Sequence, residues 1–323
     1  MPGIKKADGG PKIFLSRLKE NFEKRRLIKT THYFNPFCDL GLFVSVAHSL
    51  YNKPYILRLD GFYFDSGETL GSNSRLNAPI VKSINSAQGI IYQSQFTRKF
   101  IEEHLIKTDL PSRIIPNGVD TDLFSPLGDD CRKQLNIAAS HKVLVTSSSW
   151  RAHKRLNDIL LVFNELRKTY DNTLHLLIIG KPDQSVPNDP YIHTSGRVDP
   201  QDLPMWYRTG DLFLFLSWLD NCPNVVLEAM GCGLPVVCSN QGGTREIVER
   251  VSGGIIAMAD DEFGYHDTDL YNPPRPDHQV IITSVLDVLE NIEQYKSKIN
   301  YRALSIDRVA DGYVKFFNEI LAK

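Results

Sequence analysis

Short apolar runs alternate with amphipathic segments along nearly the whole chain. An apolar run of about four to eight residues is typical of a buried strand, whereas apolar positions three and four residues apart are typical of a helix that covers a sheet. Regular alternation of the two predicts β-α-β units, and such units build parallel sheets. The pattern therefore predicts the α/β class, with doubly wound sheets.

The first part of the chain is expected to form one such sheet. Its strands are expected at Leu27–His32, Tyr55–Leu59, Gly89–Gln93 and Arg113–Pro116. Its helices are expected at Asp39–Tyr51, Asn77–Ser86 and Thr97–Leu105. A further segment, Lys12–Lys29, is basic and has apolar residues at helical spacing, namely Phe14, Leu15, Leu18 and Phe22. The spacing favours a core helix with a solvated basic face, and the alternative is peripheral contact of this helix with a membrane.

The second part repeats the scheme. Its strands are expected at Lys142–Ser147, Leu174–Ile179, Asp211–Leu216, Pro235–Cys238 and Gly254–Ala257. Its helices are expected at Leu156–Lys168 and Asn224–Met230. The acidic, proline-rich stretch Ala259–His278 predicts a long surface loop. A last helix presents one apolar face that must pack on the rest of the chain, formed by Val309, Tyr313, Phe316, Phe317, Ile320 and Leu321.

Two domains are expected from the length of 323 residues. The stretch Pro116–Asp130 concentrates Pro, Gly and Asp and interrupts both periodicities, so it predicts the joint. We expect an N-terminal domain at 1–126, which is short, and a C-terminal domain at 127–305. A C-terminal helix at 306–323 is expected to pack back on the first domain. A cleft between two doubly wound halves follows.

Composition narrows the function classes. The formal net charge of −1 provides no global positive field, so no nucleic-acid partner is expected. Five cysteines without a CxxC pair indicate neither a zinc site nor a redox motif, and they suit a reducing compartment. The chain has no long apolar run and its N-terminus has no apolar leader segment, so we expect a cytoplasmic location.

Two acidic residues lie in apolar surroundings in the stretch that begins at Ser217. Glu228 is flanked by Val226 and Leu227 on one side and by Ala229 and Met230 on the other. A carboxylate there needs donors or a cation, and sugar hydroxyls are such donors. Asp220 follows an apolar strand, and ligands of open α/β sheets bind at the carboxyl ends of strands. The pair could hold two parts of one polyol ligand.

Basic side chains and glycine turns offer a place for phosphate. Arg151, Lys154 and Arg155 follow the first strand of the second part, where cations near a helix start suit a diphosphate. The turns Gly9–Gly10 and Gly242–Gly243 each precede a helix and offer backbone N–H groups. A solvated basic turn is the alternative for the cations. No GxGxxG, P-loop, HExxH or GxSxG motif is present, so neither an NAD enzyme nor a metalloprotease is supported.

The run from Asp220 to Gly243 resembles the retaining glycosyltransferases of family 4. It is similar to that family's EX7E element, read here as DNCPNVVLE, followed by EAMxCGxPVV and a GG turn. Further similar segments are ADGGPKIFLSRL, IIPNGVDTDLFSP, SSSWRAHKR and SGRVDPQDLPMWYRTGDLFLFLS. The resemblance implies the GT-B fold, with two Rossmann-like domains that face a cleft. It also implies a nucleotide-sugar substrate and no metal or other cofactor.

The resemblance implies a role for each matching residue. Glu228 would hold the ribose, and Asp220, in place of the family's first Glu, the hydroxyls of the transferred sugar. Phosphate contacts would come from the residues Gly9, Gly10, Arg151, Lys154, Asn224 and Val225. The family usually has an Arg where this chain has Ser149, and Arg151 would compensate. The base would be held around Arg197 and Val198.

The first domain departs from the family pattern in two ways. Asp60, in YILRLDG, stands where many relatives have a His near the reacting carbon, and it could orient the acceptor or stabilise the transition state. The family's apolar first strand is replaced here by MPGIKKAD. With Asp60, Asp220 and Lys154 as catalytic candidates, the expected function is transfer of a sugar to a glycan or lipid-linked acceptor with retention of configuration. A catalytically silent sugar-nucleotide-binding subunit and a sugar-nucleotide epimerase are the alternatives.

Overall fold

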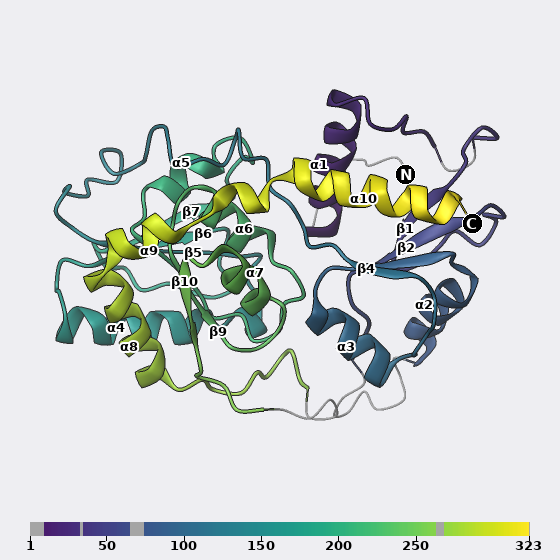
Figure 1. Ribbon diagram of the computed structural model, residues 1–323. Coiled ribbons are helices and arrows are strands. Elements are labelled where there is room, and N and C mark those ends of the chain that lie inside the picture. Colours follow the sequence, from purple (N-terminus) through teal and green to yellow (C-terminus); the bar gives the residue numbers. More distant parts are fainter. Residues whose placement is uncertain (1–9, 33–34, 65–73, 263–267, 323) are drawn as a thin grey trace.

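The computed structural model describes residues 10–32, 35–64, 74–262 and 268–322 (Figure 1). It contains two separate parallel sheets, one of four strands and one of six. The first sheet belongs to the N-terminal part of the chain and the second to the part that follows residue 142. The α/β class with two parallel sheets, the first of them smaller, is confirmed.

The first sheet has its strands in simple sequential order. They are β1 (Gly41–Val44), β2 (Tyr55–Leu59), β3 (Gly89–Tyr92) and β4 (Ser112–Ile114). Two helices cover one face through Ile80, Ile84 and Ile101, namely α2 (Ser74–Ser86) and α3 (Gln95–His104). The opposite face is covered by the first helix, α1 (Gly10–Lys24), and the last, α10 (Ile306–Leu321).

Two predictions for the first sheet are wrong. Residues 27–32 hold neither a strand nor a helix, and the edge strand β1 lies within Asp39–Tyr51, where a helix was expected. The apolar residues at helical spacing in that segment serve a different purpose. The ring of Phe43 packs edge-on against Tyr51 and Tyr55, at centroid distances of 4.9 and 5.6 Å. Aromatic packing and the ladder to β2 therefore outweigh the local helical pattern.

The second sheet has the strand order β10-β9-β8-β5-β6-β7. Its strands are β5 (Val143–Ser147), β6 (His175–Ile179), β7 (Ile192–Gly196), β8 (Leu212–Phe215), β9 (Val236–Ser239) and β10 (Gly254–Ala257). The sequence pattern missed β7, a half-exposed edge strand with the polar sequence IHTSG. The strand order reverses direction at β5, which is the mark of a Rossmann-like sheet.

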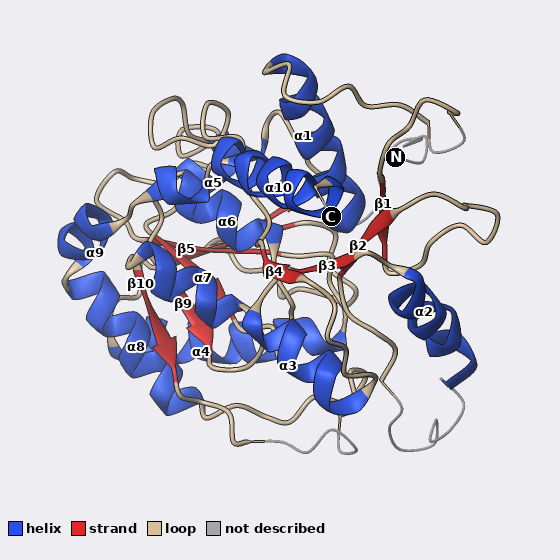
Figure 2. Ribbon diagram, turned by 45° about the vertical axis from the view of Figure 1, so that its right-hand side comes forward, coloured by secondary structure: helices blue, strands red, loops and turns tan. Residues whose placement is uncertain are grey.

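Helices cover both faces of the second sheet (Figure 2). One face carries α4 (Leu156–Thr169), α8 (His278–Glu290) and α9 (Ile292–Lys298). The other face carries α5 (Leu203–Arg208), α6 (Asn224–Gly231), α7 (Thr244–Val251) and the short 3-10 helix η4 (Tyr301–Leu304). In the described residues, none of these helices is both long and apolar enough to cross a bilayer.

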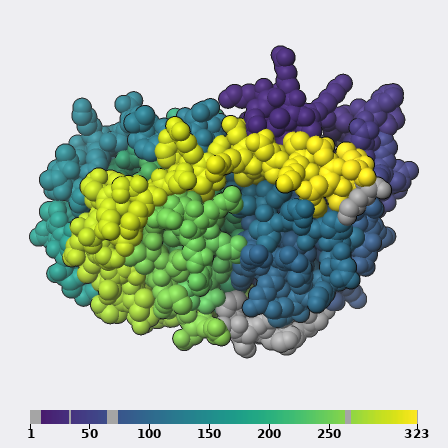
Figure 3. All heavy atoms as spheres, in the orientation of Figure 1, coloured from purple at the N-terminus to yellow at the C-terminus, as the bar shows by residue number. Residues whose placement is uncertain are grey.

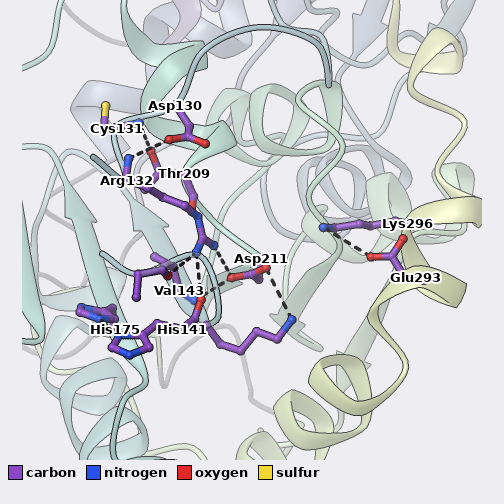
Figure 4. A network of polar contacts seen from close by, with 12 residues as sticks. Asp130, Cys131, Arg132, His141, Val143, His175, Thr209, Asp211, Glu293 and Lys296 are labelled. Carbon is purple, nitrogen blue, oxygen red and sulfur yellow. Dashed lines mark hydrogen bonds and ion pairs between the residues drawn. The ribbon is translucent and has the colours of Figure 1, made fainter. Parts of the chain in front are cut away.

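The segment before β5 is fastened to the second sheet by a polar network (Figure 4). The Arg132 guanidinium donates to Asp211 at 2.6 Å and to the carbonyl oxygens of His141 and Thr209. Asp211 in turn accepts from the backbone N–H of Val143, the first residue of β5. This network joins residues 130–141 to the six-stranded sheet, so we propose that the second domain begins near residue 127.

The chain crosses between the two sheets twice, and the crossings lie side by side. Val119 donates to the carbonyl oxygen of Leu304 at 2.9 Å and accepts from the N–H of Ile306 at 2.8 Å. A side chain on Gly118 would come within 2.8 Å of the Ile306 backbone, so glycine permits this close approach. From there α10 runs along the surface from the second half of the chain to the first (Figure 3).

α10 and α1 bury their apolar faces against each other. The Phe14 ring lies 6.1 Å from Tyr313, and Phe22 lies 6.3 Å from Phe317. At the helix surface Arg25 pairs with Asp311 at 2.7 Å. The structure therefore matches the core-helix interpretation of α1, and its apolar face is not available to a membrane.

Candidate active site

The reversal of strand order in the second sheet places two chain segments at one point. β5 and β8 are adjacent parallel strands, and the loops that leave their carboxyl ends begin at Ser148 and Leu216. In open α/β sheets the crevice at such a reversal is where ligands bind. The candidate residues Lys154 and Asp220 both lie on these two loops.

Lys154 and Asp220 form an ion pair with 2.6 Å between Nζ and Oδ2. Lys154 ends the 3-10 helix η2 (Ala152–Lys154), and its ammonium also donates to the Ser217 hydroxyl at 3.2 Å. Neighbouring His153 is kept neutral because burial, followed by the charge of Lys154, lowers its pKa to about 4. The crevice therefore holds one cation and one carboxylate in direct contact, both with part of their surface open.

Glu228 lies on α6 and is almost fully buried, with 4% of its surface exposed. Its Oε1 lies 2.5 Å from Nη2 of Arg17, a residue of α1. Its Oε2 accepts from the hydroxyl of Tyr207 at 3.2 Å. Burial, reinforced by the charge of Glu228, raises the pKa of Tyr207 well above its usual value, so this phenol stays a donor. Both carboxylate oxygens thus have partners, one of them from the first domain.

The starts of α1 and α6 meet at the domain interface. The side-chain amide of Asn224, the first residue of α6, donates to the Gly10 carbonyl oxygen at 3.0 Å. Asn117, in the first crossing, donates to Asn224 at 2.8 Å and to the carbonyl oxygen of Cys222 at 3.0 Å. Two helix starts that face the same region concentrate backbone N–H groups there, which suits an anion. Gly9, the other glycine of this turn, lies outside the described residues.

The second glycine pair, Gly242–Gly243, has a role different from the anion binding that was expected. The N–H of Gly243 donates to the carbonyl oxygen of Asp220 at 2.7 Å, so this donor is already used. A side chain on Gly243 would come within 2.0 Å of the Asn221 carbonyl oxygen. Gly242 has φ of +80°, and a side chain there would meet the Asp220 backbone at 2.6 Å. The pair therefore supports the loop that carries Asp220.

Asp60 follows β2 and is paired with Arg58 of the same strand. Burial raises the pKa of Asp60, and the charge of Arg58 opposes this shift. Arg58 is fully buried, stacks on the Phe14 ring at 4.4 Å and donates to Asn117. The Asn221 amide, directly after Asp220, donates to the Asp60 carbonyl oxygen at 2.6 Å. The acid of the first domain is thus held next to the loop of Asp220.

The remaining candidates are placed less centrally. Ser149, Arg151 and Arg197 are exposed, and Val198 and Val225 are half-buried against the core of the second domain. Arg155, the third cation of its cluster, points elsewhere. Its side chain is fully buried, and its guanidinium pairs with Asp260 at 2.5 Å. The expectation that all three cations serve a diphosphate is therefore wrong for Arg155.

Sequence reasoning missed the partners of the acidic residues. Arg58 is an arginine inside an apolar strand, and this pattern could have indicated a buried ion pair with Asp60 two residues later. Arg17 lies on the apolar side of a basic helix, where nothing in the pattern distinguishes it from its solvated neighbours. Tyr207 and Asn117 gave no signal, because their contacts depend on how the helices and crossings pack.

Comparison with known families gives a match over the second sheet. The profile described as "Glycosyl transferases group 1" matches residues 140–267, from just before β5 to just beyond β10. N-acetyl-alpha-D-glucosaminyl L-malate synthase of Bacillus anthracis is 26% identical over 208 residues, which cover 61% of this chain and 53% of that protein. Lipopolysaccharide 1,2-N-acetylglucosaminetransferase of Salmonella typhimurium is 28% identical over 49% of this chain and 46% of its own length. The chain spans about half the length of these curated relatives.

Comparison with solved structures concerns the whole fold. Sucrose-phosphate synthase from Thermosynechococcus elongatus has a TM-score of 0.65 at 17% identity, covering 84% of this chain and 69% of its own. The Anabaena protein HepE in complex with UDP has a TM-score of 0.62 at 18% identity, covering 83% of this chain and 72% of its own. These likenesses identify the two-domain arrangement as the GT-B fold.

Proposed function

This chain belongs to the group 1 glycosyl transferases of family 4 and has the GT-B fold, and on this premise we propose that it transfers a sugar from a nucleotide-diphosphate sugar to a glycan or lipid acceptor with retention of configuration. The observation that carries the proposal is the Lys154–Asp220 ion pair at the strand-order reversal of the second sheet. A cation and a carboxylate at this point can serve a diphosphate and the sugar attached to it.

The donor would lie along the loops of the second domain. Lys154 and the backbone N–H groups at the starts of α1 and α6, near Gly10 and Asn224, would hold the diphosphate. Asp220 would turn from Lys154 to the hydroxyls of the transferred sugar once the phosphate takes over the ammonium. Glu228 would accept from the ribose hydroxyls, and the base would lie near Arg197 and Val198.

The reaction requires stabilisation of the charges that develop on both sides of the breaking bond. As the bond between the anomeric carbon and the phosphate oxygen breaks, negative charge grows on the diphosphate and positive charge on the sugar ring. Lys154 is placed to stabilise the first charge and a carboxylate the second. Asp60, on the facing domain, would orient the acceptor hydroxyl, whose proton would pass to the departing phosphate.

UDP is the first donor nucleotide to test. The solved structures similar in fold include HepE in complexes with UDP and with UDP-glucose. Curated relatives include a lipopolysaccharide N-acetylglucosaminetransferase and an alpha-monoglucosyldiacylglycerol synthase of Acholeplasma laidlawii. These names support a glycan or lipid acceptor as the class to screen.

Calorimetric titration of the full chain with UDP, GDP, ADP and their common sugar conjugates tests the proposal. We expect selective binding of one base, lost in Glu228→Ala, and slow hydrolysis of the matching sugar nucleotide without an acceptor. Failure of all these ligands to bind the wild type would overturn the proposal. Binding with no hydrolysis and no transfer would favour the alternative of a catalytically silent binding subunit. This alternative has to be distinguished because the candidate acid Asp60 is buried in its pair with Arg58.

A further inference from the structure

Among the described residues, Arg17 is the one partner of Glu228 that comes from the first domain. Its side chain is 13% exposed and its guanidinium lies 5.2 Å from the Phe124 ring centroid. Its Nη1 is buried and has no hydrogen-bond partner in the part of the chain that the structure describes. An arginine presents five donors, so this one still has capacity to bind an acceptor. The guanidinium is thus a buried, under-satisfied cation at the edge of the candidate donor site.

Glu228 has little room for a further ligand while Arg17 is bound. The carboxylate is buried, and each oxygen already has a partner, Arg17 for one and Tyr207 for the other. Its oxygens can accept further hydrogen bonds, but only 5% of the side chain is exposed, so a ribose diol can reach the carboxylate only if a side chain that covers it moves aside. Tyr207 is fully buried behind α6, so Arg17 is the donor that can leave.

Displacing Arg17 is costly unless another anion receives it. A buried charge left without its partner strongly destabilises a protein, whereas an exchange of partners does not. A nucleoside brings hydroxyls but no anion, and a nucleoside diphosphate brings both. Asn224 starts α6 one turn before Glu228, a rise of about 6 Å, and it contacts Gly10 at the start of the helix that carries Arg17. A phosphate held between these helix starts is within reach of a long side chain that turns from Glu228.

We propose that Arg17 is an additional donor-site residue that exchanges Glu228 for the diphosphate when the ribose arrives. It thereby makes the site select nucleoside diphosphates over nucleosides. The inference rests on the proposed function, since it takes Glu228 as the ribose acceptor. It adds a cation from the first domain to Lys154 of the second, so that both domains contact the same ligand.

The test is the ratio of dissociation constants for uridine and UDP, or for guanosine and GDP where guanine is the base that binds. Titrations compare wild type, Arg17→Met, Arg17→Lys and the control Arg25→Met. Arg25 directly follows the helix that carries Arg17, but its pairs with Asp307 and Asp311 stay within the contact of this segment with α10. Thermal unfolding of each variant shows whether the fold is kept.

In Arg17→Met we expect tighter nucleoside binding and weaker diphosphate binding, so that the ratio falls at least about tenfold, as loss of a charge-assisted contact predicts. Arg17→Lys should retain most of the ratio, and Arg25→Met should retain all of it. Equal changes for both ligands in a folded Arg17→Met would mean that Arg17 only ties the domains together, and would overturn the inference. Absence of nucleotide binding in the wild type would instead remove the proposed function itself.

Discussion

At the scale of residues, the two acids of the DNCPNVVLE segment differ in their surroundings. Asp220 is partly open and meets an ammonium of its own domain, whereas Glu228 is buried and meets a guanidinium of the other. The two cations are about equally exposed, at 14% for Lys154 and 13% for Arg17, so the carboxylates make the difference. Asp220, 22% exposed, exchanges its partner at a lower cost than a buried charge, because water partly screens it. A buried pair exchanges only for an equivalent set of contacts. This difference fits a mobile sugar group at Asp220 and a fixed ribose at Glu228.

Lys154→Met is expected to distinguish the contribution of the phosphates to binding from that of the nucleoside. The substitution keeps the apolar stem and removes the charge, so UDP should bind about tenfold to a hundredfold more weakly, the range of about 1.5–3 kcal/mol for a charge-assisted contact. Uridine should change by less than about threefold. Titration with both ligands checks this. The exposed Lys168 of α4, which pairs with Glu165, serves as control when replaced by Met, and an equal loss for uridine and UDP in Lys154→Met would contradict the phosphate role.

At the scale of elements, α10 completes the first domain from the far end of the chain. Phe316 is buried beneath the sheet next to Gly89, where even an added methyl group would lie 2.9 Å from its ring. Arg113 of β4 lies 5.5 Å from the centroid of the same ring. The first sheet therefore depends on a helix that follows it by about two hundred residues. Such a helix can pack only after the second domain has been made.

Phe316→Ala should lower the free energy of unfolding by about 3–5 kcal/mol, the range for loss of a buried phenyl ring. Leu321→Ala, on the same helix but half-exposed, should cost less than about 1 kcal/mol. Urea unfolding followed by circular dichroism measures both. Similar losses for the two variants would mean that α10 is not seated on the first sheet in solution.

Three histidine rings stack across the second sheet near the amino ends of the neighbouring strands β5, β6 and β7. His175, at the start of β6, lies between His141 and His193, with nitrogen to nitrogen distances of 2.9 and 3.0 Å. Burial, followed by the charges of these neighbours, lowers the pKa of His175 to about 4. A histidine whose pKa is depressed by folding contributes stability above its unfolded pKa of about 6.5, and this stability is lost as the pH falls toward 4.

The wild type should therefore lose about 2 kcal/mol of unfolding free energy between pH 6.5 and pH 4 through His175. His175→Asn should flatten this part of the pH profile, whatever its effect on stability at neutral pH. Urea unfolding at several pH values gives the slopes, and an unaltered slope in His175→Asn would show that this ring does not titrate with folding.

At the scale of the whole molecule, the sequence predicted what depends on local pattern. Strands such as Tyr55–Leu59 and Val143–Ser147 are buried on both faces, and a short, mostly apolar run is enough to identify them. The pattern failed for β7, an edge strand of polar sequence, and for β1, whose apolar residues lie in a segment with helical spacing. It named Lys154 and Asp220 as candidates but not Arg17, because the contact of Arg17 with Glu228 joins elements distant in sequence and has no local signature.

The two domains are also held together away from the crevice. Glu246 of α7 accepts from the backbone N–H groups of Gln95 and Phe96, at 2.8 and 2.7 Å. These donors belong to the first turn of α3, so a carboxylate of one domain caps a helix of the other. Such a cap is the interdomain counterpart of an N-cap side chain. It lies beside the pair Gly242–Gly243 that supports Asp220, so this contact between the domains adjoins the candidate site.

Glu246→Ala should release this cap. Amide hydrogen exchange in the first turn of α3 should accelerate about tenfold or more, as expected from loss of a cap worth about 1–2 kcal/mol. The rest of α3 should exchange as before, because its remaining N–H groups bond within the helix. Glu249→Ala is the matched control, since Glu249 lies on the same helix but pairs with Arg245 at the surface. Equal exchange in both variants would mean that the domains in solution do not rest on this contact.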